Sequence, residues 1–214
     1  MLQFQHSINA PAFRKYIAII YLVGVFGLSF SISRNLFIQL IPINILLANL
    51  LLFYSALPMN IRFLLPVTFI GISGFFLEYW GVETGMIFGN YDYGTVMGPK
   101  LLGIPLLIGV NWIFVVVCAV QLAKKWISRP VFIPFLAGIL VTFYDFWLEA
   151  FAIRYGLWTW YSESVPIQNY IAWFFIGSFF ASVYFFTNRN KEIPIASALF
   201  IIQLLFFFIL YWLP

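Results

Sequence analysis

Long apolar segments follow one another along almost the whole chain, and short polar breaks separate them. A helix that crosses a bilayer needs about 20 consecutive apolar residues. We therefore predict spans at residues 16–32, 36–57, 63–80, 104–122, 131–151, 170–186 and 193–213. The pattern predicts an all-α fold, a polytopic transmembrane bundle of about seven spans that forms one integral membrane domain over residues 1–214.

The breaks between these segments carry residues typical of turns, such as Ser33-Arg34-Asn35 and Asn188-Arg189-Asn190-Lys191. Two connections are longer, residues 81–103 and 152–169. These two connections lie on the same side of the predicted bundle, so they are the places where residues outside the spans can gather.

The composition agrees with a membrane protein and narrows its chemistry. Hydrophobic residues make up 64% of the chain and charged residues 8%, against roughly 25% charged in soluble domains. With one cysteine, Cys118, and one histidine, His6, the chain cannot form an internal disulfide or a typical zinc or haem site, so we expect no metal and no cofactor. The net charge of +4 forms no basic stripe, which argues against a nucleic acid partner.

The basic residues predict an orientation in the membrane. Eight of the eleven Lys and Arg residues fall on one side of the predicted bundle and three, Arg34, Lys100 and Arg154, on the other. The positive-inside rule then places the N-terminus in the cytoplasm and the C-terminus outside, in what we expect to be a bacterial cytoplasmic membrane. The N-terminus has no features of a removed signal peptide, so we take the whole chain as mature.

The acidic residues show the opposite distribution. Six of the seven lie at or beyond the non-cytoplasmic ends of the third and fifth predicted spans: Glu78, Glu83, Asp92, Asp145, Glu149 and Glu163. Glu78 and Asp145 are expected about 9 Å below the surface of a roughly 30 Å apolar core. A carboxyl group at that depth normally faces a polar cavity or a partner, although single acids at helix ends can also reach the headgroups.

Glu149 follows Asp145 by one helical turn and shares its helix face, with the two side chains about 6 Å apart. Two carboxyl groups this close in an apolar setting cannot both ionise easily, so we expect one to keep its proton. An acid beside a base is the arrangement that proton-transfer catalysis requires. The catalytic candidates are therefore Asp145, Glu78, Glu83, Glu149 and Asp92.

Aromatic residues crowd the same side of the predicted bundle. An interfacial aromatic belt explains part of this crowding, but rings between buried acids could also line an apolar pocket and stabilise a cation. We expect the glycine-rich loop 85–94 to fold over the acids. The substrate-binding candidates are Trp80, Tyr91, Tyr93, Trp158, Trp160 and Asn169.

A weak internal similarity links the two long connections. Each follows a span that ends in acids, and each leads to a proline with a tryptophan seven residues later, Trp112 after Pro105 and Trp173 after Pro166. Two related hairpins or a chance similarity between aromatic-rich segments would both give this pattern.

Several strings in these regions resemble the membrane carotenoid-biosynthesis hydratases, the family of bisanhydrobacterioruberin hydratase and γ-carotene 1'-hydroxylase. The similar strings are Gly81-Val82-Glu83-Thr84-Gly85, Phe88-Gly89-Asn90-Tyr91-Asp92-Tyr93, Pro99-Lys100-Leu101-Leu102-Gly103-Ile104-Pro105, Gly156-Leu157-Trp158-Thr159-Trp160 and Val165-Pro166-Ile167-Gln168-Asn169-Tyr170. The resemblance covers roughly residues 65–180 and is carried by the order and spacing of unusual strings.

The resemblance implies hydration of the terminal double bond of an acyclic carotenoid end without a redox cofactor. The implied substrate is γ-carotene or a lycopene-like carotenoid that reaches the protein through the lipid bilayer, and other enzymes of the pathway are further candidate partners. The residues themselves suggest how: a carboxylic acid protonates the alkene, and water adds to the tertiary cation with a second carboxylate as base.

The sequence leaves two alternatives open, a carotenoid cyclase and an uptake subunit, and argues against a third, a prenyltransferase. A carotenoid cyclase would use the same protonation and end in ring closure. A prenyltransferase normally needs two Asp-rich motifs for magnesium diphosphate, and Asp145-x-x-x-Glu149 is the only approximation here. A non-catalytic subunit for small-molecule uptake would explain the aromatic residues but not the convergence of the acids.

Overall fold

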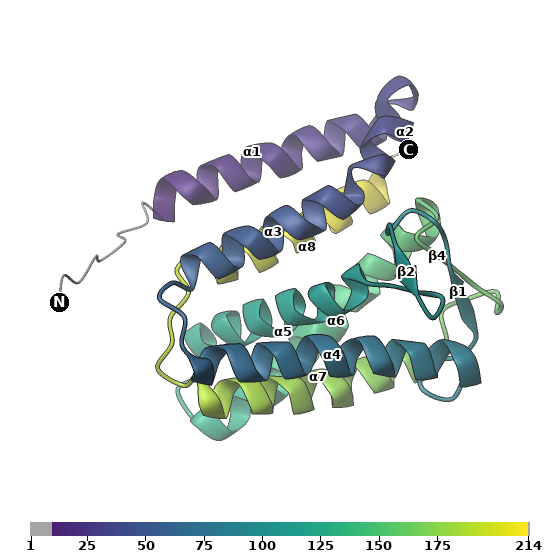
Figure 1. Cartoon of the computed structure of the whole chain (residues 1–214). Helices are drawn as coiled ribbons and strands as arrows, with labels where there is room; N and C mark the ends of the chain where they lie inside the picture. The colour runs from purple at the N-terminus through teal and green to yellow at the C-terminus, as the bar shows by residue number, and fades with distance from the viewer. Residues whose placement is uncertain (1–9, 214) are drawn as a thin grey trace.

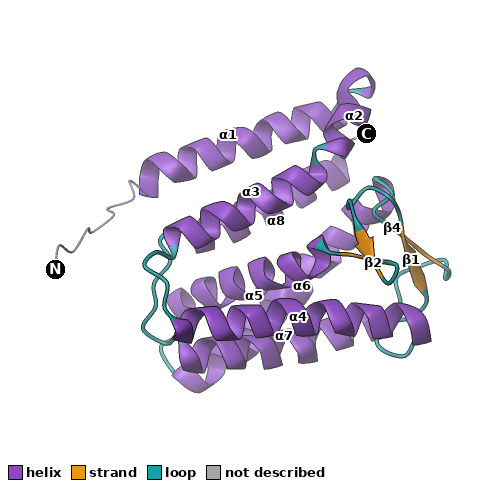
Figure 2. Ribbon diagram, in the orientation of Figure 1, coloured by secondary structure: helices purple, strands orange, loops and turns teal. Residues whose placement is uncertain are grey.

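The computed structural model describes residues 10–213 and consists almost entirely of helices (Figure 1, Figure 2). His6 lies outside the described residues. The elements in chain order are α1 (Ala10–Ser29), α2 (Ser31–Gln39), α3 (Ile41–Ser55), α4 (Ile61–Thr84), β1 (Tyr91–Tyr93), β2 (Lys100–Leu101), β3 (Ile104–Pro105), α5 (Leu107–Trp126), a 3₁₀ turn (Pro130–Phe132), α6 (Ile133–Arg154), β4 (Trp158–Trp160), α7 (Ile167–Thr187) and α8 (Ala196–Trp212).

The all-α prediction is confirmed, and each of the seven predicted segments overlaps a helix. In the described part of the chain, five helices are long and apolar enough to cross a membrane, namely α1, α4, α5, α6 with its preceding turn, and α7. The pair α2 and α3 is bent by 54° and gives a sixth span if it is counted as one. The apolar helix α8 is shorter than these spans, with 17 residues.

Helix α5 forms the centre of the bundle. Its side chains are buried along nearly its whole length, and it contacts α3, α4, α6, α7 and α8. A helix that is apolar on all sides belongs in such a position. The close approach of α4 to α5 depends on Gly71 and Gly109, because a Cβ atom on Gly109 would lie 2.5 Å from the Gly71 carbonyl oxygen.

The predicted break at Ser33-Arg34-Asn35 is wrong, since these residues lie inside α2. The side chains of Ser33 and Arg34 instead bind carbonyl groups that the end of α1 leaves free. Ser33 donates to the Gly27 oxygen at 2.8 Å, and the Arg34 guanidinium donates to the Leu28 and Ser29 oxygens. A short helix can therefore carry residues that are usually found in turns, because their side chains donate hydrogen bonds to the free carbonyl oxygens of the preceding helix.

Helix α4 contains a proline, and the carbonyl group that this proline cannot bind is satisfied by a side chain from another part of the chain. Pro66 cannot donate to the carbonyl of Arg62, one turn earlier. The Asn188 side chain, directly after α7, donates to that Arg62 oxygen at 2.9 Å. At its other end α4 stops at Gly85, which adopts a left-handed conformation. The hydrogen bond from Asn188 to Arg62 links the start of α4 to the end of α7.

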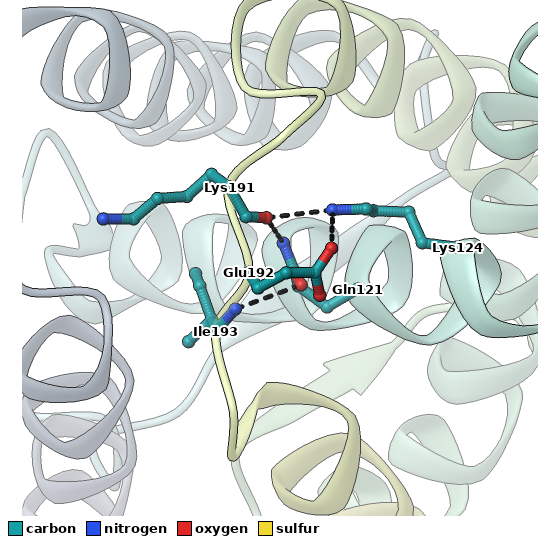
Figure 3. A network of polar contacts seen from close by, with 5 residues as sticks. All are labelled: Gln121, Lys124, Lys191, Glu192 and Ile193. Carbon is teal, nitrogen blue, oxygen red and sulfur yellow. Dashed lines mark hydrogen bonds and ion pairs between the residues drawn. The ribbon is translucent and has the colours of Figure 1, made fainter. Parts of the chain in front are cut away.

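A polar network holds the connection between α7 and α8 against α5 (Figure 3). Gln121 and Lys124 on α5 donate to the Lys191 carbonyl oxygen, and Lys124 forms an ion pair with Glu192. Gln121 also accepts from the Ile193 N–H at 3.2 Å, so one amide uses both of its polar atoms. The network satisfies backbone groups where the chain leaves helical structure.

The four short strands gather at the opposite end of the bundle, where the two long connections meet (Figure 2). β1 pairs antiparallel with β4, although the two strands are far apart in the sequence. β2 and β3 form a hairpin whose two central residues, Leu102 and Gly103, both have positive φ angles, as its tight turn requires. The β1–β4 sheet covers the ends of α4 and α6.

Candidate functional site

Three carboxyl groups are buried together beneath the β1–β4 sheet. Glu78 comes from α4, and Asp145 and Glu149 come from α6; their exposed fractions are 3%, 0% and 4%. The three groups are close enough to interact electrostatically with one another. The structure thus brings together three of the five catalytic candidates, all within membrane-spanning helices. We call Glu78, Asp145 and Glu149 the acid cluster.

Glu78 accepts three hydrogen bonds from neutral donors. The hydroxyl groups of Tyr91 and Tyr93 donate to its Oε2 at 2.5 and 2.7 Å, and Trp112 Nε1 donates to its Oε1 at 3.1 Å. Both tyrosines belong to β1, and Trp112 belongs to α5. All three donors serve a carboxyl oxygen as acceptor, so both oxygens of Glu78 are already satisfied.

The two tyrosines stay protonated in this position. Burial raises the pKa of the Tyr91 hydroxyl well above its usual value, and the nearby Glu78 carboxyl raises it further. The pKa of Tyr93 is raised for the same two reasons, with burial the larger. At neutral pH both residues are therefore hydrogen-bond donors to Glu78.

Glu149 is held by the other strand of the sheet. Trp158 Nε1 and Trp160 Nε1 both donate to Glu149 Oε2 at 2.8 Å. An indole N–H can donate but cannot accept. Glu149, like Glu78, is thus surrounded by hydrogen-bond donors, and its bonded carboxyl oxygen acts as the acceptor.

The strand pairing explains why four aromatic donors meet two acids. In β1 and β4 Tyr91 lies opposite Trp160, and Tyr93 opposite Trp158. Side chains alternate between the two faces of a strand, so these four share one face. The rings also contact one another, with 4.8 Å between the centroids of Tyr91 and Trp160. The intervening pair, Asp92 and Thr159, is exposed on the other face.

Asp145 has a different environment from the other two acids. Asn169 Nδ2 donates to its Oδ2 at 2.7 Å, while its Oδ1 is buried and has no hydrogen-bond partner. Asn169, predicted as a substrate-binding residue, therefore contacts the most deeply buried acid. A buried carboxyl oxygen without a partner is costly, and this is the open position of the acid cluster.

Within residues 10–213 no ion pair joins a basic side chain to the acid cluster. Lys100 and Arg154, the basic residues predicted near it, bind backbone carbonyl groups instead: Lys100 donates to Tyr93 O, and Arg154 to Leu210 O and Leu213 O. Within residues 10–213 the single ion pair joins Lys124 to Glu192 at the other end of the bundle. Over the same residues no group of three or more His, Cys, Asp or Glu side chains is placed to hold a metal ion.

Three of the predicted site residues do not join the acid cluster. Glu83 and Asp92 are exposed, and Asp92 accepts a hydrogen bond from the exposed Tyr161 hydroxyl. Trp80 is 60% exposed on the outer face of α4. Each belongs to the predicted region but points away, because its position along the helix or strand places it on the opposite face from Glu78 or Tyr91.

Trp112 and Trp173 are central residues that the candidate list lacks. Their rings stack with 4.1 Å between centroids and an angle of 16° between planes. The available signal is the position of each seven residues after a proline. The similarity extends further: β1 begins 13 residues after Glu78, and β4 begins 13 residues after Asp145. Corresponding parts of the two hairpins thus pair with each other in the structure.

An apolar cavity of about 400 Å³ lies beside the acid cluster, between α1, α3 and the core helices α5, α6 and α8. Helix α6 presents adjacent faces to the cavity and to the acid cluster. Tyr144 and Leu148 line the cavity, whereas Asp145 and Glu149 belong to the acid cluster. Trp158 also lines the cavity, and its N–H binds Glu149. Trp158 therefore contacts both the cavity and Glu149.

Comparison with known proteins gives one finding that bears on identity. No curated protein and no solved structure matches the chain. A family model described as carotenoid biosynthesis protein matches residues 38–213, which extends beyond the residues 65–180 of the predicted resemblance. The match covers the six helices α3 to α8 and both strands of the sheet above the acid cluster. The chain therefore belongs to the carotenoid biosynthesis protein family.

Proposed function

We propose that the protein is a hydro-lyase that adds water to the terminal double bond of an acyclic carotenoid end group, giving a tertiary alcohol. The observation that carries this proposal is the contrast within the acid cluster. Asp145 has an oxygen without a partner, whereas Glu149, one turn away, accepts two indole N–H bonds. A free acid beside a stabilised carboxylate is suited to proton transfer.

In the proposed reaction Asp145 donates the proton. Its transfer to the less substituted alkene carbon leaves a tertiary cation on the neighbouring carbon. Glu78 and Glu149, as carboxylates, and the rings of the β1–β4 sheet stabilise this cation. In the described part of the chain no lysine or arginine forms an ion pair with the acid cluster.

Water then completes the addition. A water molecule attacks the tertiary carbon and gives up one proton to Glu149, so the product gains the elements of one water. Proton transfer from Glu149 to Asp145, which lie about 6 Å apart at an i, i+4 spacing, restores the starting state. The cycle consumes no reductant, oxidant or nucleotide.

Expression in a host that makes lycopene or γ-carotene tests the proposal. Hydration predicts pigments heavier by one or two waters, with the absorption of the conjugated chain unchanged because the reacting double bond lies outside it. A new pigment of unchanged mass and a cyclic end group would instead identify a cyclase. Unmodified carotenoid retained on the purified protein, with no product, would favour a binding protein.

A further inference from the structure

The cavity beside the acid cluster is apolar at its mouth. The side chains of Ile19, Val23 and Ile43 line it and are also exposed on the outer surface of α1 and α3. In a membrane these exposed positions face lipid. The cavity is therefore accessible to a hydrophobic molecule that moves laterally out of the bilayer.

The inner part of the cavity is different, because polar groups without partners line it. Tyr144 on α6 is fully buried, and its hydroxyl has no hydrogen-bond partner; Gln203 on α8 is 5% exposed, and its Oε1 has none. Both side chains line the cavity. Orphaned polar atoms in an apolar bundle are costly, so a ligand that satisfies them gains affinity.

The packing of α8 places Gln203 on the helix face that Tyr144 contacts. The Tyr144 ring contacts Phe200 and Phe207, with centroid distances of 5.5 and 5.4 Å. Gln203 lies between those two phenylalanines in the sequence and at helical spacing from both, so it shares their face of α8. The hydroxyl can donate and the amide oxygen can accept, which together suit a single alcohol group.

We propose that this cavity binds the end of a long isoprenoid chain and that Tyr144 and Gln203 hydrogen bond to a hydroxyl group on that end. The volume of about 400 Å³ falls among pockets for drug-sized ligands, about 300–1,000 Å³. A carotenoid is longer than such a ligand, so one end lies inside and the remainder extends through the mouth into lipid. Identifying the hydroxyl as the product of hydration rests on the proposed function.

The position of the cavity fits this role. Tyr144 precedes Asp145, and Leu148 precedes Glu149, so the bound end lies against the helix that carries both acids. Trp158 contacts the cavity with its ring and Glu149 with its N–H. A side chain that touches both is the natural contact between the bound chain and the acid cluster.

Binding measurements test the assignment without relying on turnover. Lycopene and its monohydrated, terminally hydroxylated derivative are each added to the purified full chain in detergent, and pigment that coelutes with the protein is measured. We expect Tyr144→Phe and Gln203→Leu each to weaken binding of the hydroxylated carotenoid about 2- to 10-fold, the effect of one neutral hydrogen bond. Lycopene binding should stay unchanged.

Matched variants separate these effects from general damage. Tyr184 is also a fully buried tyrosine but does not line the cavity, so Tyr184→Phe should leave both affinities unchanged. Ile20 lines the cavity and Leu22 does not, and both are exposed on α1. Ile20→Trp should weaken both carotenoids, and Leu22→Trp neither.

The hydroxyl site would be overturned if the parent chain bound both carotenoids with equal affinity and if neither Tyr144→Phe nor Gln203→Leu changed this. Unchanged binding in Ile20→Trp would overturn the cavity as the binding site. The predicted pattern in a protein that hydrates nothing would leave this inference standing and remove the hydratase proposal. Hydration by a protein that binds both carotenoids equally would leave the hydratase proposal standing and remove this inference.

Discussion

Asp145 and Glu149 lie one turn apart on α6, but their hydrogen bonds assign them different chemistry. Glu149 is bound by two donors that cannot accept a proton, whereas Asp145 has one amide donor and one free oxygen. The difference comes from the partners: strand β4 supplies two indoles to Glu149, and α7 supplies Asn169 to Asp145. Residues of one chemical type on one helix face thus acquire distinct roles from the segments packed on them.

Asp145→Asn keeps the side-chain shape and removes the proton, so we expect hydration to fall by roughly 10² to 10⁴-fold, as for the loss of a general acid. The rate of product formation in purified protein measures this. Glu163→Gln makes the same chemical change at an exposed position in the connection after β4 and should have little effect. Near-normal hydration by correctly folded Asp145→Asn would move the donor role to Glu78.

Trp158→Phe removes one of the two donors to Glu149 while keeping an aromatic ring in the wall of the cavity. The weakened support of a buried carboxyl should lower stability by about 1–3 kcal/mol and the hydration rate by about tenfold. Thermal unfolding and product formation measure the two effects. Trp80→Phe is the matched control, since Trp80 is mostly exposed and outside the acid cluster. Identical results for the two variants would contradict the role of the Trp158 N–H.

The buried acids were predictable from the sequence, but their partners were only partly so. Depth within a span and the i, i+4 spacing were enough to select Glu78, Asp145 and Glu149. The same reasoning could not exclude Glu83 or Asp92, because a shift of one residue along a strand or a few along a helix reverses the face. Trp112 lies 34 residues from Glu78, and such a contact depends on helix packing that local patterns do not encode.

At the scale of elements, the antiparallel pairing of β1 with β4 positions four of the six side chains that donate to the acid cluster. The sheet has three residue pairs, with Tyr91 opposite Trp160 and Tyr93 opposite Trp158. Its register is supported by the bond from the Gly94 N–H to the Leu157 oxygen at 2.8 Å. A movement of β1 relative to β4 would displace donors to both Glu78 and Glu149.

Gly94→Ala tests this dependence. The added Cβ would lie 2.2 Å from the Gly156 carbonyl oxygen, a backbone atom, so the strands must separate. We expect a loss of about 1–3 kcal/mol in unfolding free energy, typical of overpacking, together with reduced hydration. At Gly98 a Cβ meets nothing within 4 Å, and its positive φ is the one source of strain. Gly98→Ala should retain hydration, and an equal loss of activity in both variants would argue against the sheet as the positioning element.

The longer helices could be predicted because each is a long apolar segment, but the strands could not. β1 and β4 have three residues each, too few for a periodic pattern, and each strand's partner lies in the other long connection. The break assigned at residues 33–35 failed for another reason. Ser33 and Arg34 cap the end of α1 through their side chains while their own backbone is helical.

At the scale of the whole molecule, the two ends of the bundle have different contents. The sheet lies at one end (Figure 1), with the acid cluster buried beneath it and the cavity beside the cluster. The network around Lys124 and Lys191 (Figure 3) lies at the other end, where α5 ends and the chain connects α7 to α8. The first described residues of α1 and the last of α8 also lie at opposite ends (Figure 1). This arrangement agrees with an odd number of crossings, counting α2 with α3 as one segment and α8 as another.

The charge distribution predicts how this arrangement sits in the membrane. Reporter domains fused after Pro214 should be active only outside the cytoplasm, because eight of eleven basic residues fall on the side of the N-terminus. Reporters inserted between Asn188 and Lys191 should be active only in the cytoplasm. A cytoplasmic signal from the C-terminal fusion would contradict the orientation and put the acid cluster near the inner surface.

The source of the new oxygen atom tests the central claim most directly, namely that the acid cluster adds water to a carotenoid without a redox cofactor. Purified protein is incubated with lycopene under anaerobic conditions in water enriched in the heavy oxygen isotope, and the product is analysed by mass spectrometry. The account predicts an alcohol that carries the heavy isotope in full, with Asp145→Asn forming roughly 10² to 10⁴-fold less of it. Product that forms only in air, with oxygen derived from O₂, would contradict the account.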